Sequence, residues 1–274
     1  MSKAALKSLA KKIIPLSLRV KLKQIGYHYQ DIVNPIKGAR VPSRAATFIG
    51  GGDFVAVGDD FFETLKRHGL KPDHIIMDVG CGQGRMARPL VDYLTGGSYT
   101  GLDIAKSGIE WCKSEYADVP SFRFLHMDLY NSRYNAMGKT QAKEYVFPVE
   151  DNSQDMIFLT SVFTHMLAAD IENYLNEFNR VLKPGGTALI TWYILDDLSR
   201  GAKEAALDFC HEFDDVSRTT VKSTPEAAIA FDIDFVKSAY ENAGLTIASI
   251  EQGHWARPES PYMLQDMIIA RKAN

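Results

Sequence analysis

The sequence has few cysteines and no long apolar run. The three cysteines, Cys81, Cys112 and Cys210, are odd in number and widely spaced, so neither a disulfide framework nor a metal site built on cysteine is expected. No apolar run approaches the roughly 18 residues of a membrane span, and the N-terminus lacks the continuous apolar core of a secretory signal. These absences predict an intracellular, cytoplasmic protein without a bound metal.

Acidic residues are almost missing from the first 46 positions. This segment carries ten Lys/Arg and one acid, Asp31, whereas the other 228 residues carry 21 basic and 33 acidic side chains. We therefore expect two parts, a basic arm at 1–46 and an acidic domain at 47–274. An acidic domain is unlike the basic domains that bind nucleic acid, so no nucleic-acid partner is expected.

The arm has apolar side chains at helical spacing and seven basic side chains among its first 23 residues. The apolar residues are Leu6, Leu9, Ile13, Leu16 and Val20. Such a helix can lie in the headgroup layer of an anionic membrane, which predicts peripheral contact at the inner face of the membrane through residues 1–25. Pro15 interrupts the helix, and two alternatives remain: a packed lid or dimer arm, and an organelle transit peptide.

From residue 59 onward the chain alternates between helical and strand patterns. Strands are expected at 75–79, 98–102, 122–127, 155–160, 187–193, 245–251 and 263–270. Helices are expected at 59–68, 85–94, 107–116, 170–182, 202–213 and 226–243, and residues 130–150 resemble an insertion. This alternation predicts βαβ units and a parallel sheet, whose ligand lies beyond the carboxyl ends of the strands.

A glycine-rich turn, Asp78–Gly84, follows the first strand. Gly80 and Gly82 permit a tight turn, and the next helix begins with N–H groups that suit a carboxylate. Asp78 would face a positively charged group. A ligand with an amino-acid part carries both an ammonium and a carboxylate and would fit Asp78 and the helix N-terminus together, and S-adenosylmethionine is such a ligand. The alternative is a dinucleotide site, but here the third glycine comes one residue early and Arg85 takes its usual place.

Two further acids end the second and third strands. Asp103 lies 19 residues after Gly84, where an acid can accept both ribose hydroxyls. Asp128 is followed by Leu129 and can accept from an adenine amino group. A strand-terminal Asp alone often caps a helix or a turn, but three of them beside one glycine loop indicate a single site.

On these residues the chain resembles the class I S-adenosylmethionine-dependent methyltransferases over about residues 48–272. The resemblance includes the Asp78–Gly84 loop, both later acids and Arg180–Gly186. It implies an α/β, doubly wound, seven-stranded and mostly parallel sheet in the order 3-2-1-4-5-7-6, with the last strand antiparallel. The implied S-adenosylmethionine-binding residues are Asp78, Gly80, Cys81, Gly82, Gly84, Asp103, Ile104, Asp128, Leu129 and Ser161.

Shorter segments are similar to one bacterial subgroup that often accompanies glycosyltransferases. They lie at 50–54, 161–167, 253–255 and 265–266. This resemblance suggests a small-molecule or glycan acceptor, including a lipid-linked one. The fourth strand lacks the Asn/Asp-Pro-Pro-Tyr/Phe pattern of enzymes that methylate adenine or glutamine nitrogen, and a hydroxyl acceptor is the favoured expectation.

Methyl transfer needs alignment and exclusion of water more than a catalytic motif. A hydroxyl acceptor must also lose a proton, and His165, four residues past the fourth strand's end, is the candidate base; the alternative is a helix-capping His165. Predicted pocket residues are Phe54 (in a lid), Thr160, His254 and Trp255. Two other functions stay open: a scaffold on this fold, and a dinucleotide-dependent oxidoreductase.

Overall fold

The computed structural model describes residues 25–27, 29–34, 38–44, 47, 52–131, 135–202 and 205–274. The stripe from Leu6 to Val20 lies outside these residues, as do Gly50 and Gly51 of the predicted lid. The predicted boundary after residue 46 also falls among residues that the structure does not describe, and it stays a prediction. Among the helices that are described, none is long and apolar enough to cross a membrane.

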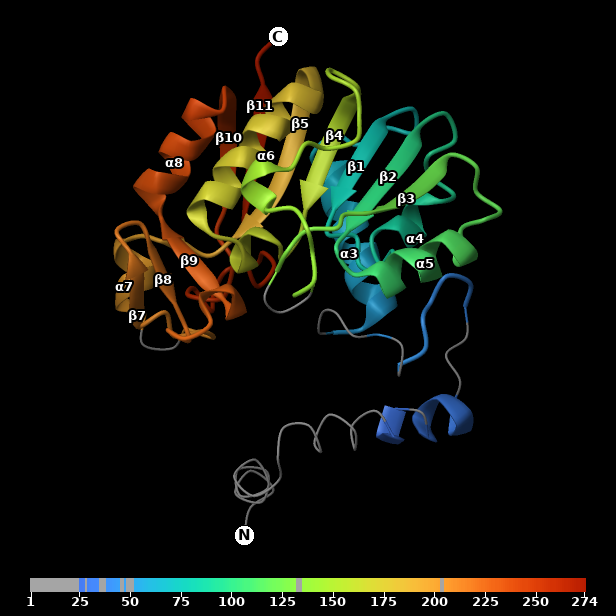
Figure 1. Cartoon of the computed structure of the whole chain (residues 1–274), viewed down its shortest axis with the longest axis horizontal. Coiled ribbons are helices and arrows are strands. Elements are labelled where there is room, and N and C mark those ends of the chain that lie inside the picture. The colour runs from blue at the N-terminus through green and yellow to red at the C-terminus, as the bar shows by residue number, and fades with distance from the viewer. Residues whose placement is uncertain are drawn as a thin grey trace.

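Seven strands form the central sheet in the order β10-β11-β5-β4-β1-β2-β3 (Figure 1). They are β1 (Ile75–Val79), β2 (Ser98–Asp103), β3 (Phe122–His126), β4 (Gln154–Leu159), β5 (Leu182–Trp192), β10 (Leu245–Glu251) and β11 (Asp266–Lys272). β11 runs antiparallel to β5 and β10, and the pairs among β1 to β5 are parallel. The doubly wound, mostly parallel sheet and its strand order are confirmed.

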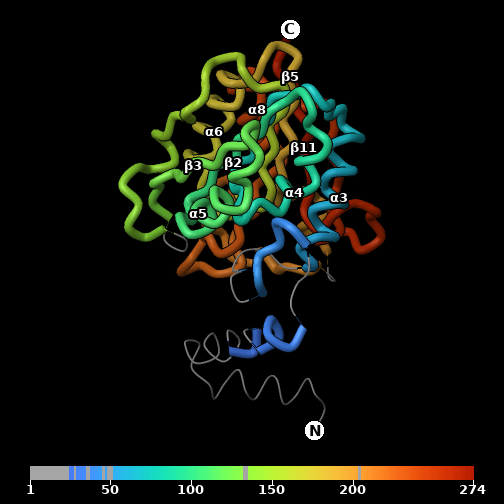
Figure 2. Tube along the Cα trace, turned by 90° about the vertical axis from the view of Figure 1, so that its right-hand side faces the viewer, coloured from blue at the N-terminus to red at the C-terminus, as the bar shows by residue number. Residues whose placement is uncertain are grey.

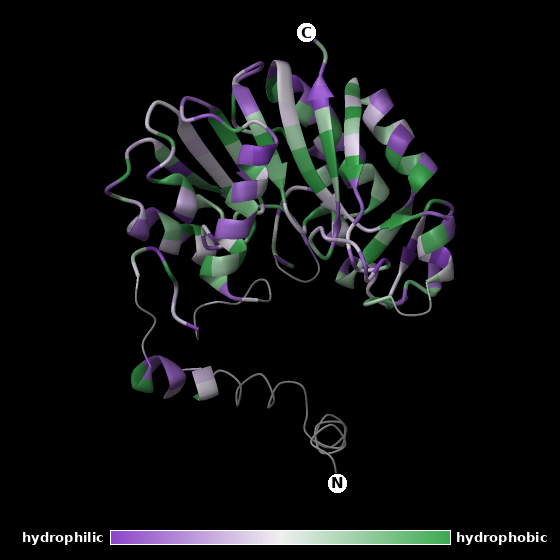
Figure 3. Cartoon of the chain, turned by 180° about the vertical axis from the view of Figure 1, so that it is seen from behind, coloured by the Kyte–Doolittle hydropathy of each residue, from purple (hydrophilic) through white to green (hydrophobic). Residues whose placement is uncertain are grey.

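Helices cover both faces of this sheet (Figure 1). One face packs on α6 (Ala168–Val181) and α8 (Ile233–Asn242), and the other on α3 (Phe54–Arg67), α4 (Ala87–Leu90) and α5 (Lys106–Glu115). Successive strand residues enter opposite cores, Ile76 one and Met77 the other. Burial on both faces explains why the central strands β1 and β4 are mostly apolar; Figure 3 shows the sheet mainly in green and white, between helices marked with purple.

A second, four-stranded sheet in the order β6-β9-β8-β7 lies between β5 and α8 in the chain. Its strands are β6 (Ile194–Leu195), β7 (His211–Asp214), β8 (Ser217–Thr219) and β9 (Ile229–Asp232), and α7 (Asp197–Gly201) follows β6. In Figure 1 this sheet lies at the end of the molecule toward which β4 points. It was not expected from the sequence.

This sheet corrects two helix predictions. The described residues of 202–213 are not helical, and the helix predicted at 226–243 begins only at Ile233. Residues 229–232 are apolar enough for either structure, and their pairing with β8 and β6 makes them a strand. A third difference concerns α3, which begins at Phe54 because Asp53 accepts hydrogen bonds from Val55 N and Ala56 N.

Residues 38–44 of the basic arm lie against the domain (Figure 2). Arg40 forms an ion pair with Asp118 at 2.7 Å and lies over the ring of Tyr116, 5.4 Å from its centroid. Arg44 donates to Asp31, the one acid of the arm. The arm is therefore linked to the end of α5 through Arg40, whereas the Arg44–Asp31 pair lies within the arm itself.

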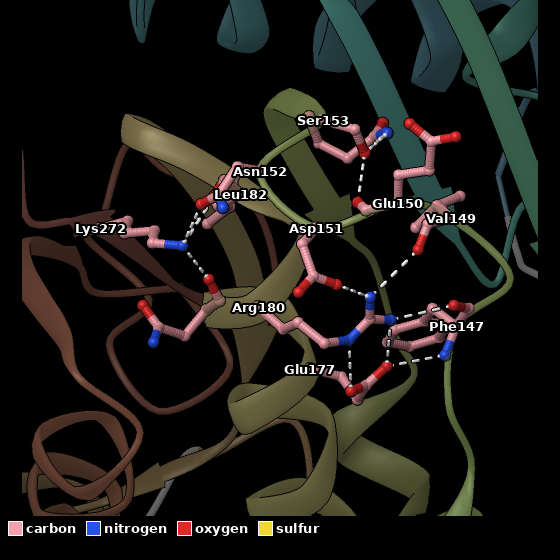
Figure 4. Close-up of polar contacts among 12 residues, drawn as sticks. Phe147, Val149, Glu150, Asp151, Asn152, Ser153, Glu177, Arg180, Leu182 and Lys272 are labelled. Atoms are coloured by element: carbon pink, nitrogen blue, oxygen red, sulfur yellow. Dashed lines mark hydrogen bonds and ion pairs between the residues drawn. The ribbon is translucent and has the colours of Figure 1, made fainter.

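Arg180 joins α6 to the loop that leads into β4 (Figure 4). Its guanidinium donates to Glu177 at 2.6 and 2.8 Å, to Asp151 at 2.6 Å, and to the carbonyls of Phe147 and Val149. Glu177 also accepts from Phe147 N at 2.7 Å. The bonds to the two carboxylates raise the pKa of Arg180 above its ordinary value, so this clamp stays charged.

Arg180→Met is expected to lower the free energy of unfolding by about 2–3 kcal/mol, because it leaves the buried Glu177 carboxylate without its cation. Urea denaturation measures the loss. The control is Arg218→Met, which breaks an exposed pair with Glu212 and should cost at most about 1 kcal/mol. Equal losses in both variants would contradict the buried clamp.

Candidate functional site

A cavity of about 270 Å³ lies beyond the carboxyl ends of the central parallel strands. Its lining includes seven residues singled out from the sequence: Gly80, Asp103, Ile104, Leu129, Thr160, Ser161 and His165. They come from the ends of β1, β2, β3 and β4, which the parallel sheet places along one edge. This edge is where open α/β sheets bind their ligands.

The turn after β1 needs its glycines. Gly80, Gly82 and Gly84 have φ values of 84°, 56° and 70°, and a Cβ on Gly80 would lie 2.3 Å from Cγ2 of Val162. Left-handed backbone costs a residue with a side chain about 1–2 kcal/mol. Gly80 therefore lets the turn after β4, which carries Val162, approach the turn after β1.

Asp103 fixes this loop from the side. It is 5% exposed; one carboxylate oxygen accepts from Gly82 N and the other from Ala105 N, both at 2.7 Å. Burial raises the pKa of Asp103, while these two hydrogen bonds act in the opposite direction. Each oxygen has a second lone pair, so the side chain can order the loop and still accept from a ligand hydroxyl in the cavity.

Asp78 is fully buried and does not line the cavity. One of its oxygens accepts from the Tyr99 hydroxyl at 2.6 Å, and the other has no hydrogen-bond partner among the described residues. Burial, reinforced by the nearby charge of Asp103, raises the pKa of Asp78 to about 8. The structure thus does not show Asp78 exposed toward a ligand's positive group, as the sequence suggested; a cation close to it would favour the ionised form.

The residues that follow β3 line two neighbouring cavities. Leu129 lines the main cavity, whereas Asp128 lines an adjoining one of about 550 Å³ together with Lys106 and Lys139. Ile104 borders both. Ile104 and Leu129 can thus form apolar walls for a flat ring, with Asp128 at its outer edge.

The orientation of His165 is set by a main-chain carbonyl. Its Nδ1 lies 2.9 Å from the carbonyl oxygen of Glu226. A carbonyl only accepts, so Nδ1 carries the hydrogen and the neutral ring has its lone pair on Nε2. This tautomer is the one that a base acting through Nε2 requires.

Three predicted pocket residues do not line the cavity. Phe54 lies under the guanidinium of Arg85, 5.4 Å from its ring centroid. His254 is exposed, with Nδ1 2.9 Å from the carbonyl of Tyr262, and Trp255 is buried and donates from Nε1 to Asp266 at 2.8 Å. The loop between β10 and β11 turns its tryptophan into the core rather than toward the cavity.

The cavity also has lining residues that sequence analysis did not place in the site: Tyr130, Asn131, Asp170, Tyr174, Glu226 and Gln265. They come from the insertion after β3, from α6, from the turn Pro225–Ala227 and from the residue before β11. No sequence spacing connects these segments. Only Gln265 carried a signal, because it belongs to the segment 265–266 that is similar to the bacterial subgroup.

Residues 77–190 match the family model described as a methyltransferase domain. The chain is 27% identical over 209 residues to sterol 24-C-methyltransferase ERG6B of Gibberella zeae, covering 70% of this chain and 47% of that protein. It is 28% identical over 141 residues to the tRNA N(3)-cytidine methyltransferase METTL2 of Gallus gallus, covering 48% of this chain and 34% of that protein. Each alignment thus spans less than half of the relative, and the second runs weakly against the expected exclusion of nucleic acid.

Solved structures share the fold. A SAM-dependent methyltransferase of Methanosarcina mazei is 20% identical with a TM-score of 0.53, covering 76% of this chain and 97% of its own. A putative O-methyltransferase of Nostoc punctiforme is 14% identical with a TM-score of 0.56, covering 80% of this chain and 56% of its own. At these identities the likeness concerns the fold alone.

Asp78→Asn is expected to change how stability depends on pH. Folding raises this pKa from 3.8 to about 8, so the folded chain holds a proton that the unfolded chain releases. The contribution of Asp78 to the free energy of unfolding is therefore most favourable below the pKa of the unfolded chain, and it declines as the pH rises toward 8. The advantage of the variant should grow from pH 4 to pH 8 in urea denaturation, whereas Asp92→Asn, at an exposed site, should show no such trend. A constant difference for Asp78→Asn would contradict the raised pKa.

Proposed function

We propose that this chain, which carries a class I S-adenosylmethionine-dependent methyltransferase domain, is an enzyme that methylates a small-molecule acceptor. The observation that carries the proposal is the cavity at the carboxyl edge, where Gly80, Asp103 and Ser161 come together. A scaffold protein would have no need of this arrangement. A dinucleotide site is disfavoured, because Arg85 replaces the third glycine of that pattern.

The residues present fit S-adenosylmethionine. The loop at Gly80–Gly84 excludes side chains where a ligand's amino-acid part would lie, and Asp103 has lone pairs for ribose hydroxyls. Ile104 and Leu129 would enclose the adenine, with Asp128 at its edge. The unpartnered oxygen of buried Asp78 fits a nearby ammonium group.

The cofactor, when bound, supplies a methyl group on a sulfonium sulfur, which is a good leaving group. The acceptor's lone pair forms the new bond to carbon while the carbon–sulfur bond breaks onto sulfur. The chain aligns the two partners and excludes water. In this proposal His165, held as its Nδ1–H tautomer by Glu226, takes the proton that the acceptor loses.

The acceptor in this proposal is a hydroxyl of a small molecule or glycan, including a lipid-linked one. Support comes from the similarity of segments such as 161–167 to a subgroup that accompanies glycosyltransferases. The named relatives act on sterols and on tRNA, and one further relative is a phosphoethanolamine N-methyltransferase of Caenorhabditis elegans. Their shared feature is the transferred methyl group and not the acceptor.

Calorimetry with S-adenosylhomocysteine and NAD tests the cofactor. The wild-type chain should bind the first and not the second. Asp103→Ala should weaken that binding by about 2–4 kcal/mol, because charge-assisted hydrogen bonds to the ribose are lost. The same change removes the acceptor of Gly82 N and Ala105 N, so its melting temperature is measured in parallel. Binding of NAD alone would overturn the proposal.

His165→Asn is expected to reduce methyl transfer about 10²–10⁴-fold while leaving the affinity for S-adenosylhomocysteine nearly unchanged. Asparagine can still donate to the Glu226 carbonyl, so the turn is kept and only the base is lost. The measurement is transfer of labelled methyl groups into a glycan and lipid extract of the source cells. A wild-type rate would show that His165 is structural.

We also infer that the arm contacts an anionic membrane. Residues 1–46 carry nine more basic than acidic side chains, and each near an anionic surface contributes about 1 kcal/mol before screening by salt. Within the described part, Ile25, Tyr29, Ile32 and Val33 are all exposed. In Figure 1 this segment lies beyond the end of the domain toward which β4 points, the end that holds the cavity.

Co-sedimentation with anionic vesicles tests the membrane contact. Binding should decrease as salt increases and disappear when residues 1–25 are deleted, because both the attraction and the apolar stripe are then removed. Neutral vesicles are the control. If the full-length chain stays in the supernatant at low salt, the arm has a packing role instead.

A further inference from the structure

The turn after β4 holds a strained residue inside the cavity. Ser161 has φ 56°, a left-handed conformation that is unfavourable for a residue with a side chain. Its N–H donates to Thr191 Oγ1 at 2.7 Å, which helps to keep the backbone in this conformation. Strain of this kind is often retained where it aims a functional group. Here it aims an exposed hydroxyl, because Ser161 is accessible and lines the cavity.

Ser161 is also close to the glycine loop. The next residue, Val162, packs so tightly on Gly80 that a Cβ there would be 2.3 Å from its Cγ2. Gly80 and Ser161 line the same cavity. The hydroxyl therefore borders the place where the amino-acid part of the cofactor, and with it the transferable methyl group, would lie.

Gln265 fixes the direction of this hydroxyl. Ser161 Oγ donates to Gln265 Oε1 at 3.0 Å, and Gln265 Nε2 donates to the Tyr193 hydroxyl at 3.4 Å. An amide oxygen only accepts, so the single hydroxyl hydrogen of Ser161 is committed to it. The oxygen of Ser161 then presents lone pairs, and no hydrogen, to a ligand in the cavity.

A buried carboxylate holds Gln265 in place. The next residue, Asp266, is 1% exposed and accepts from Ile194 N, Gly253 N and Trp255 Nε1, each at 2.8 Å. These bonds tie the start of β11 to β6 and to the β10–β11 loop. Tyr193, the other hydrogen-bond partner of Gln265, packs against the ring of Trp255 in a small hydrophobic cluster.

We propose that Gln265 is a positioning residue. By accepting the hydroxyl hydrogen of Ser161, it directs the Ser161 oxygen to accept a hydrogen bond from the reacting group of the methylated substrate. The inference rests on the function proposed above. Such a site selects a nucleophile that carries a hydrogen, an O–H or N–H, over one that reacts at carbon. Before transfer the O–H or N–H donates to Ser161 Oγ, which only orients it. The acceptor's lone pair then forms the bond to the methyl carbon while the carbon–sulfur bond breaks onto sulfur, and the positively charged product afterwards loses its proton to His165.

A purely structural link between two loops is the competing explanation. A hydrogen bond of this kind contributes little to stability when it is exposed to solvent, and it gives no reason for strain at Ser161. It also predicts that loss of the link affects all ligands equally. The two explanations therefore differ in ligand selectivity and not in stability.

Sinefungin is a probe that needs no knowledge of the acceptor. It carries an amine-bearing carbon in place of the sulfonium sulfur and its methyl group, so it presents N–H groups at the transfer position. S-adenosylhomocysteine lacks them. The ratio of the two dissociation constants, measured by calorimetry, reports the hydrogen-bond acceptors at that position.

Ser161→Gly and Gln265→Leu should each reduce the preference for sinefungin over S-adenosylhomocysteine about tenfold, because the oriented lone pair is lost. Glycine suits the φ of residue 161, so that variant should fold. Gln265→Glu still accepts from Ser161 and should keep the preference. Gln252→Leu makes the same change at an exposed glutamine of the β10–β11 loop and should also keep it.

The outcomes separate the two proposals. If the wild-type chain binds neither ligand, the proposed function fails, and this inference with it. If it binds both but the ratio is unchanged in Ser161→Gly and Gln265→Leu, only the role of Gln265 and Ser161 is overturned. If Gln265→Glu loses the preference as Gln265→Leu does, the amide does not act by accepting from Ser161, and the inference is wrong.

Discussion

The geometry of the site depends on the hydrogen bonds that the carboxylate of Asp103 accepts. Asp103 ends β2 and accepts from the glycine loop through Gly82 N and from the start of α5 through Ala105 N. Two consecutive strand–helix turns are thereby held by one buried group. Burying a carboxylate is unfavourable unless its oxygens are hydrogen-bonded, so the turns and the charge stabilise one another.

The second constraint is the close approach of the turns after β1 and β4. Val162 occupies the space that a side chain at residue 80 would need, and Ser161 adopts a left-handed conformation beside it. The parallel sheet makes this meeting unavoidable, because β1 and β4 are neighbours and end at the same edge. The residues proposed to bind the cofactor and those proposed to face the acceptor thus belong to one packed contact between the two turns.

The residues proposed for the acceptor side are held by the segments around the second sheet and by the β10–β11 loop. His165 is held by the carbonyl of Glu226, which follows the added sheet strand β8. Gln265 is held through Tyr193 and Asp266, which contact β6 and the β10–β11 loop. The match to the methyltransferase-domain model ends at residue 190, so Tyr193, Glu226 and Gln265 lie outside the part of the chain that the model covers.

The sequence by itself determined the fold and the cofactor class, and five of the ten residues predicted to bind the cofactor line the cavity: Gly80, Asp103, Ile104, Leu129 and Ser161. Those features depend on short-range patterns: strands buried on both faces are apolar throughout, and glycines and acids at strand ends are adjacent in the chain to the strands that place them. Tertiary structure decided what depends on pairing between distant segments. Residues 229–232 became a strand because β8 and β6 flank them, and Trp255 entered the core because Asp266 accepts its indole N–H. Gln265 reached the cavity for the same reason: its contacts to Ser161 and Tyr193 span 104 and 72 residues, distances over which no local sequence pattern records which side chains will meet.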